Sequence, residues 1–115
     1  MSRQATPVFS LPVTLSGTVA AHRFVTPAGA QAGADANTLG VARTGGVSGD
    51  KITVDVIGTA VVESGAAVSA NDTLETDSSG RAVTWATSGP KVGMALQAAS
   101  GAGEFIEVLL VQNVD

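Results

Sequence analysis

The chain has 115 residues, of which 44% are hydrophobic but only 3% aromatic and 14% charged. Its formal net charge is −4 and its six Lys and Arg residues are scattered, which argues against a nucleic-acid partner because phosphate neutralisation needs clustered basic side chains. Cysteine is absent, which excludes disulfides and thiolate metal sites. The 14 glycines and the many Val and Thr residues favour short strands and tight turns, so we expect one all-β domain.

The first segment, residues 1–16, holds Pro7 and Pro12 among alternating apolar residues. Proline is tolerated in extended segments and edge strands but not in central strands, because it lacks the N–H that a ladder requires. We therefore predict an extended N-terminal arm or edge strand over residues 1–16 and a single compact β-barrel domain over residues 17–115. No window resembles a signal peptide or approaches the roughly 18 apolar residues of a membrane span, so we expect no membrane partner.

The clearest strand pattern follows at residues 51–64, where Ile52, Val54 and Val56 alternate with polar residues. Gly58 interrupts this alternation and predicts a bulge or bend. The spacing of turn residues between short apolar runs is typical of a small β-sandwich or barrel, and no segment predicts a helix. Shorter strands are expected at residues 18–26, 38–43, 72–77, 81–86, 91–97 and 104–112.

The two halves of the chain also resemble each other weakly, in the same order along the sequence. A duplication would predict two similar β-halves closing into one barrel with pseudo-twofold symmetry. Chance matches in a chain this rich in Ala, Gly and Val are the alternative. Val19 and Ala21 match Val68 and Ala70, Gly40 and Ala42 match Gly93 and Ala95, and Gly49, Ile52 and Val54 match Gly103, Ile106 and Val108.

The acidic stretch at residues 71–85 raises the question of a metal or catalytic site. Counted from Asp72, an EF-hand would need an oxygen ligand at its third position and glycine at its sixth, where this sequence has Leu74 and Asp77. A hairpin explains the stretch better, because Asp77 can begin a turn and Gly80 can accept a positive φ. We therefore predict a turn here and no metal ligand.

Patterns for other chemistry are missing from the sequence. His22 is the single histidine, and neither a GxSxG nor a GxxxxGK[ST] motif occurs. We therefore predict no catalytic residue, no cofactor and no enzymatic activity. Trp85, the single tryptophan, is expected to be the packing centre of a core that is otherwise built from small side chains.

One resemblance concerns the run GAAVSANDTLETD, which is similar to the segment before the hairpin of biotinyl or lipoyl carrier domains. Those domains carry the modified lysine at the hairpin tip. Here the tip is the tripeptide at residues 78–80, SSG, and the only lysines are Lys51 and Lys91. A carrier domain therefore stays a minor alternative.

A second resemblance covers most of the chain, from Val13 to Val111. A GVA strand, the GDKITVDVIG strand, the hairpin from NDT to GRA, and the closing VGMAL and IEVLL runs follow one another as in the decoration, or cement, proteins of tailed-phage capsids. Each motif is made of Gly, Ala and Val and is weak alone, so their order and spacing carry the resemblance.

The resemblance implies a small β-barrel on the outer capsid surface of the virion, made in the host cytoplasm. Such proteins bind the major capsid protein, commonly as a homotrimer near local threefold positions, and brace neighbouring subunits. The alternative class is another non-enzymatic structural β module, such as a tail-tube or adhesin domain.

The N-terminal segment supplies the candidate interface with the capsid or a neighbouring subunit. It is too apolar for a free tail and too rich in proline for a central strand, so it is suited to add a strand to an exposed sheet edge. We expect it to become ordered on the particle. The candidate contact residues are Val8, Phe9, Leu11, Pro12 and Val13.

Overall fold

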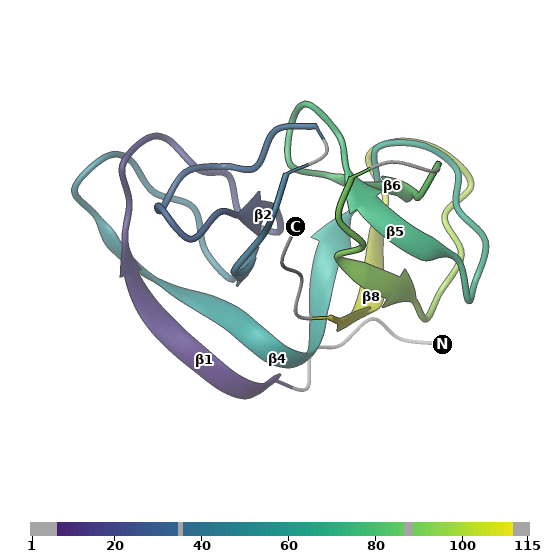
Figure 1. Ribbon diagram of the computed structural model, residues 1–115, viewed down its shortest axis with the longest axis horizontal. Coiled ribbons are helices and arrows are strands. Elements are labelled where there is room, and N and C mark those ends of the chain that lie inside the picture. Colours follow the sequence, from purple (N-terminus) through teal and green to yellow (C-terminus); the bar gives the residue numbers. More distant parts are fainter. Residues whose placement is uncertain (1–6, 35, 87–88, 112–115) are drawn as a thin grey trace.

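The computed structural model describes residues 7–34, 36–86 and 89–111 and folds them into strands joined by turns (Figure 1). Neighbouring strands are antiparallel in the order β2-β3-β4-β8-β7-β5-β6, and β1 lies beside β4. Within the described ranges no helix occurs that could span a membrane. The strands are β1 (Pro7–Thr14), β2 (Phe24–Val25), β3 (Gly40–Ala42), β4 (Lys51–Glu63), β5 (Thr73–Thr76), β6 (Ala82–Thr84), β7 (Gly93–Ala95) and β8 (Phe105–Leu110).

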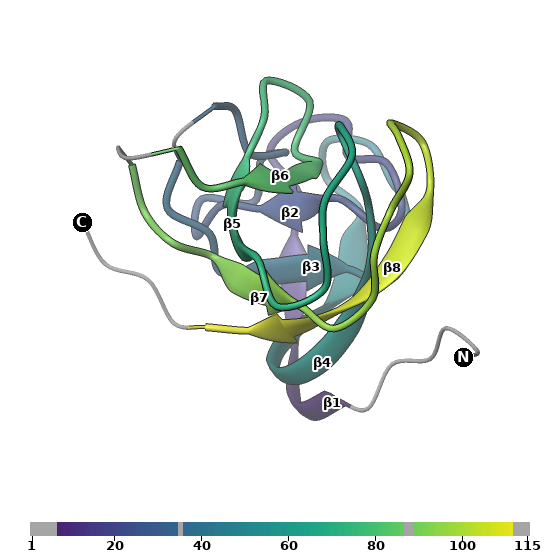
Figure 2. The same ribbon diagram turned by 90° about the vertical axis from the view of Figure 1, so that its right-hand side faces the viewer.

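The sheet curls on itself into a nearly closed barrel, which Figure 2 shows from its end. The predicted all-β barrel class is therefore confirmed. Residues 7–14 form an edge strand of this sheet, whereas the division into an arm over 1–16 and a barrel over 17–115 stays a prediction.

The long strand β4 connects the two ends of the molecule (Figure 1). Its first part pairs with β1 and β3, and its last part, from Thr59 to Glu63, pairs with β8. The strand bends between these parts at Gly58, whose φ of 107° lies in the region that favours glycine. The pairing of β1 with β4 shifts register at the same place, so the predicted irregularity at Gly58 is confirmed.

The bend divides the sheet into two similar units, which we call unit 1 (residues 10–56) and unit 2 (residues 59–110). In unit 1, β1 pairs with β4 so that Leu11 opposes Val54, and in unit 2, β4 pairs with β8 so that Ala60 opposes Val108. The final part of β4 therefore plays in unit 2 the role that β1 plays in unit 1. Likewise, β3 and β7 are equivalent, because Ala42 opposes Val54 as Ala95 opposes Val108.

The turns before the second strand of each unit show the same equivalence. His22 and Asn71 both adopt a positive φ, 64° and 76°, which is uncommon for residues other than glycine. The backbone N–H of His22 donates to the carbonyl of Ala42, and that of Asn71 donates to the carbonyl of Ala95. The similarity between the two halves of the sequence thus corresponds to two copies of one β unit in space.

The apolar interior forms two clusters, one for each unit. The unit 1 core is made only of unit 1 residues, including Leu15, Val25 and Val54. The unit 2 core contains Leu74 and Ile106 of unit 2, but it also takes in side chains of unit 1. These contributed side chains are Phe24, Ala32 and Val41, which are between 0% and 1% exposed.

The prediction that Trp85 is the packing centre is wrong, because the ring is half-buried and belongs to neither core cluster. Phe24 and Leu74 hold the central positions instead and are fully buried. The indole Nε1 of Trp85 donates to the carbonyl of Gly89 at 3.1 Å, and the Nζ of Lys91 lies 4.6 Å from the ring centroid. The indole therefore lies at the surface with its polar edge bonded, as amphipathic rings often do.

Candidate functional site

Strand β1 carries all five predicted contact residues, which differ in their exposure. Val8 and Phe9 are 76% and 48% exposed, and Pro12 is also exposed. Leu11 and Val13 are half-buried and pack against the unit 1 core. The five predicted residues thus lie on one strand, and three of them are exposed.

The outer edge of β1 is defined by comparison with the equivalent part of β4. In the last part of β4, the carbonyl of Val61 lies 3.2 Å from the Nδ1 of His22, and the N–H of Glu63 donates to the carbonyl of His22. The backbone groups of Val61 and Glu63 therefore face His22 and not β8. Pro12 and Thr14 of β1 occupy the equivalent positions. Pro12 therefore turns its missing N–H away from β4, where it costs no hydrogen bond of the ladder.

A buried carboxylate attaches β1 to the rest of unit 1. Asp55 of β4 is 2% exposed and accepts hydrogen bonds from the guanidinium of Arg43, at 2.6 Å, and from the hydroxyl of Ser10, at 2.8 Å. Because Ser10 stands on β1 and Arg43 follows β3, one carboxylate links three strands. This link was not predictable from the sequence, since only the strand register places Ser10 opposite Asp55.

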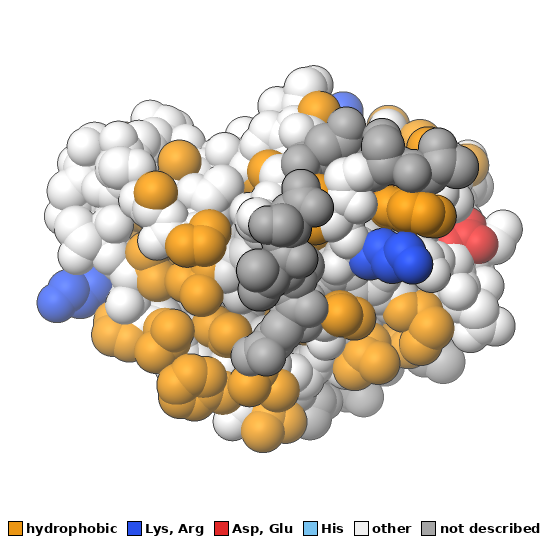
Figure 3. All heavy atoms as spheres, viewed as in Figure 1, with side chains coloured by type: hydrophobic (Ala, Val, Ile, Leu, Met, Phe, Trp, Pro, Cys, Tyr) orange, Lys and Arg blue, Asp and Glu red, His pale blue; other side chains and the backbone are white. Residues whose placement is uncertain are grey.

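Further apolar side chains continue the surface beyond β1. Ile57 of β4 opposes Phe9 and is 39% exposed, and Leu109 of β8 is 38% exposed. Figure 3 shows hydrophobic side chains gathered over β1 and β4 and again over the β7–β8 region of the same face. An exposed gathering of apolar side chains becomes a candidate contact surface where it is contiguous, as over β1 and β4.

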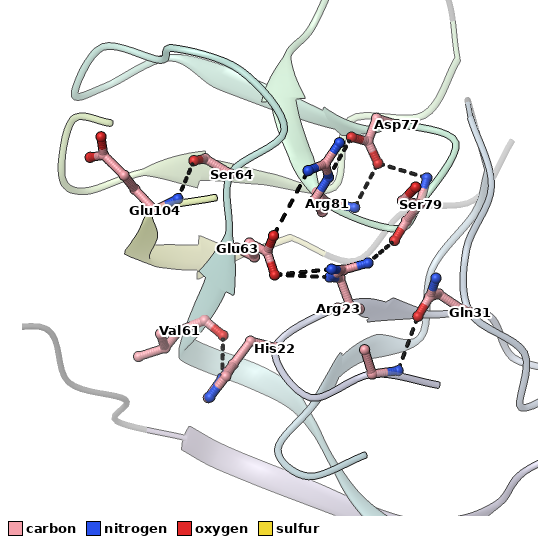
Figure 4. Close-up of polar contacts among 11 residues, drawn as sticks. His22, Arg23, Gln31, Val61, Glu63, Ser64, Asp77, Ser79, Arg81 and Glu104 are labelled. Atoms are coloured by element: carbon pink, nitrogen blue, oxygen red, sulfur yellow. Dashed lines mark hydrogen bonds and ion pairs between the residues drawn. The ribbon is translucent and has the colours of Figure 1, made fainter. Parts of the chain in front are cut away.

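The acidic stretch proves to be a turn held by ion pairs, as predicted (Figure 4). One oxygen of Asp77 accepts the N–H groups of Ser79 and Arg81, the other accepts the Nε of Arg81 at 3.0 Å, and Gly80 has a φ of 74°. The hairpin therefore uses Asp77 to satisfy its own backbone and side chains. Among the residues that the structure describes, no three His, Asp or Glu side chains group as metal ligands would.

The same turn is tied to unit 1 by Arg23. Its guanidinium donates to Glu63 at 3.0 Å and to the carbonyl of Ser79 at 2.9 Å, and Arg81 approaches Glu63 at 3.8 Å (Figure 4). The side chains are roughly four-fifths buried, with exposures from 18% to 28%. This network joins the two units, and each of its charges has a partner of opposite sign.

The family described as phage cement protein matches residues 3–110. The chain belongs to this family. Its members are phage structural proteins.

The fold has a solved counterpart, the crystal structure of the head fiber gp8.5 N base in bacteriophage phi29. The TM-score is 0.72, and the alignment covers 93% of this chain and 98% of that chain at 18% sequence identity. At this identity the likeness shows a shared fold. No curated protein matches the sequence.

Family membership confirms the resemblance that the order of the GVA, GDKITVDVIG and VGMAL runs indicated. Sequence reasoning did not find the exposed positions Ile57 and Leu109, because strand alternation alone does not show which part of a sheet stays uncovered. The alternation of β8 carried a signal: Ile106 and Val108 lie on the buried face, so the apolar residue at Leu109 had to face outwards.

Proposed function

We propose that this protein binds the outer surface of an assembled phage head and stabilises the contacts between major capsid subunits. The observation that carries the proposal is the family match over residues 3–110. The similarity of fold to the base of a phage head fiber supports an attachment role on a head. The proposed role is structural and requires no catalysis.

The capsid contact is assigned to β1. Val8, Phe9 and Pro12 are exposed along this edge strand, and Ile57 lies opposite Phe9. Leu11 and Val13 hold the strand to the unit 1 core by apolar packing. A capsid segment that added a strand to this edge would gain main-chain hydrogen bonds, while Val8 and Phe9 would fill pockets on the partner. Because residues 7–14 are already paired with β4 in the single chain, this contact does not require them to become ordered on the particle, which differs from the expectation drawn from the sequence.

Attachment at many sites makes modest contacts sufficient. Three copies around a local threefold position would each touch a neighbouring capsid subunit, and linked contacts raise the overall affinity by roughly 10²–10⁴ over a single one. Such a trimer would bridge subunits and oppose their separation.

The test uses undecorated heads and purified full-length chain. Heads are mixed with the protein, pelleted, and the bound copies counted; their rupture on heating or chelation is followed by electron microscopy. We expect saturable binding to heads and a higher rupture temperature. A protein that binds purified tails but not heads would belong to a different part of the virion, and one that binds neither would end the proposal.

Matched variants locate the contact. Phe9→Ser with Val8→Ser removes the apolar side chains of β1, whereas Val47→Ser changes a side chain that is 55% exposed in the loop between β3 and β4. We expect the double variant to bind heads at least tenfold more weakly and the control to bind normally. Equal binding by all three proteins would place the contact away from β1.

A further inference from the structure

Unit 1 and unit 2 differ in whether the outer face of their sheet is covered. In unit 1, Phe24 of β2 opposes Val41 of β3, and both side chains are buried in the unit 2 core. In unit 2, the equivalent pair is Thr73 of β5 and Met94 of β7. Thr73 is exposed and Met94 is only half-buried, so unit 2 presents the face that unit 1 buries.

The open face of unit 2 carries three apolar side chains beside Thr73, and the Nζ of Lys91 lies over one of them, the ring of Trp85. Met94 lies between Thr73 and Leu109 in the strand register, and the N–H of Trp85 donates to the carbonyl of Thr73, so these side chains belong to neighbouring strands. Trp85 replaces Ala32, whose N–H makes the equivalent bond to Phe24 in unit 1. We call Thr73, Trp85, Met94 and Leu109 the β5–β8 face. Figure 3 shows apolar side chains exposed in the β7–β8 region.

The unit 1 core is less completely covered than the unit 2 core. Leu11, Val13 and Leu39 pack against this core but remain half-buried. The residues at the equivalent positions of unit 2 are Ala60, Val62 and Val92, which are 1%, 0% and 1% exposed, in a core that also takes in Phe24 and Val41 of unit 1. Unit 2 is thus closed by a face of unit 1, whereas nothing within the described residues closes unit 1 in the same way.

We propose that a second copy of this chain closes unit 1 by placing its β5–β8 face over Leu11, Val13 and Leu39. The contact between the two units of one chain is the model for this interface. In that contact, the β2–β3 face of unit 1 covers the core of unit 2, and each of these two surfaces has an equivalent in the other unit. The partner is a second copy of this chain, because the β5–β8 face is the equivalent of the face that covers the core of unit 2, and the chain itself carries it. The inference rests on the self-association in the proposed function and names its surfaces. The contact joins unlike surfaces, so copies associate head to tail and can close into a ring.

The single tryptophan makes this contact measurable without labels. Trp85 belongs to the β5–β8 face and would lose water when a second copy covers it. Sedimentation and tryptophan emission are recorded for the full chain over a wide range of concentrations. We expect a concentration-dependent oligomer and an emission maximum that moves to longer wavelength on dilution, with both changes at the same midpoint.

Two variants on the face and one control outside it decide the assignment. Met94→Glu places a charge at the centre of the β5–β8 face, and Leu109→Ser removes an apolar group from its edge. We expect each to weaken self-association at least tenfold, while Val47→Ser in the loop between β3 and β4 leaves it unchanged and circular dichroism confirms that all fold. A protein that is monomeric throughout with constant emission, or an oligomer that both face variants leave intact, overturns the inference.

These outcomes are independent of the head-binding assay. A chain that self-associates through this face yet ignores heads would refute the proposed function alone. A monomeric chain that decorates heads would refute only the head-to-tail contact.

Discussion

The two units share a strand register but stabilise the same position by different chemistry. In unit 1, Asp55 of β4 is buried and bonded to Ser10 and Arg43, whereas unit 2 has Leu109 at the equivalent place, 38% exposed. At this position unit 1 has a buried carboxylate that holds the edge strand β1, and unit 2 has an exposed apolar side chain. The backbone pattern therefore fixes the fold, while the side chains on its outer faces decide which surfaces stay internal and which meet partners.

The largest effect on stability is expected at the residue that unit 1 inserts into unit 2. Phe24→Ala leaves a cavity beside Val41 and should lower the free energy of unfolding by about 3–5 kcal/mol. Urea unfolding measures the change. Phe105→Ala is the matched control, because Phe105 is 38% exposed and packs edge-on against His22, so it should cost about 1 kcal/mol. Equal losses would mean that Phe24 is not the link between the units.

A second comparison concerns two equivalent glycines. A Cβ at Gly40 would collide with the carbonyl of Asp55, and one at Gly93 would lie 2.7 Å from the carbonyl of Leu109. Both alanine variants should therefore be destabilised, by about 1–3 kcal/mol, with the larger loss at Gly40 because its clash is closer. Thermal unfolding of the two variants checks the order. Gly33→Ala, where nothing lies within 4 Å, is the control and should change little.

The polar anchor can be converted to the chemistry of unit 2. Asp55→Leu leaves the half-exposed Arg43 without its carboxylate and should cost about 1–3 kcal/mol. Adding Arg43→Leu recreates the pair Leu109 and Leu96 of unit 2 and should recover most of that loss, since neither partner of the ion pair is then left uncompensated. Chemical denaturation of the single and double variants gives the coupling. A double variant as unstable as the single one would show that the anchor is needed for folding.

The smallest effect on stability is expected at Trp85. Its ring lies outside both cores, so Trp85→Ala should cost about 1 kcal/mol or less, mainly through the lost contact with Lys91. The same variant should weaken self-association clearly, which sedimentation detects. A large loss of stability in a monomeric protein would return Trp85 to the interior of the barrel.

Much of the fold was accessible from the sequence because local patterns agreed with it. The alternation at Ile52, Val54 and Val56, the turn at Asp77 to Gly80, and the recurrence of Gly40 at Gly93 each follow from short-range rules of pleat and turn. These features predicted a barrel of two similar halves and the absence of an EF-hand pattern.

The remaining features depend on which strands become neighbours. We predicted Trp85 in the core because large apolar rings are usually buried. In the structure it belongs to the β5–β8 face of unit 2, which no other element of the described residues covers. The burial of Asp55 follows from the register with Ser10, which spacing along the chain does not reveal. The candidate interface stays a prediction: its five residues lie on one strand, but the packing of Leu11 and Val13 against the unit 1 core, which the sequence did not show, leaves only Val8, Phe9 and Pro12 exposed.

Electron cryomicroscopy of undecorated heads incubated with the full chain tests the central claim most directly. The account predicts added density on the outer capsid surface into which the barrel fits, with the outer edge of β1, carrying Val8, Phe9 and Pro12, against a capsid subunit. Heads that gain no density, or barrels whose β1 edge faces solvent while another surface touches the capsid, would contradict it.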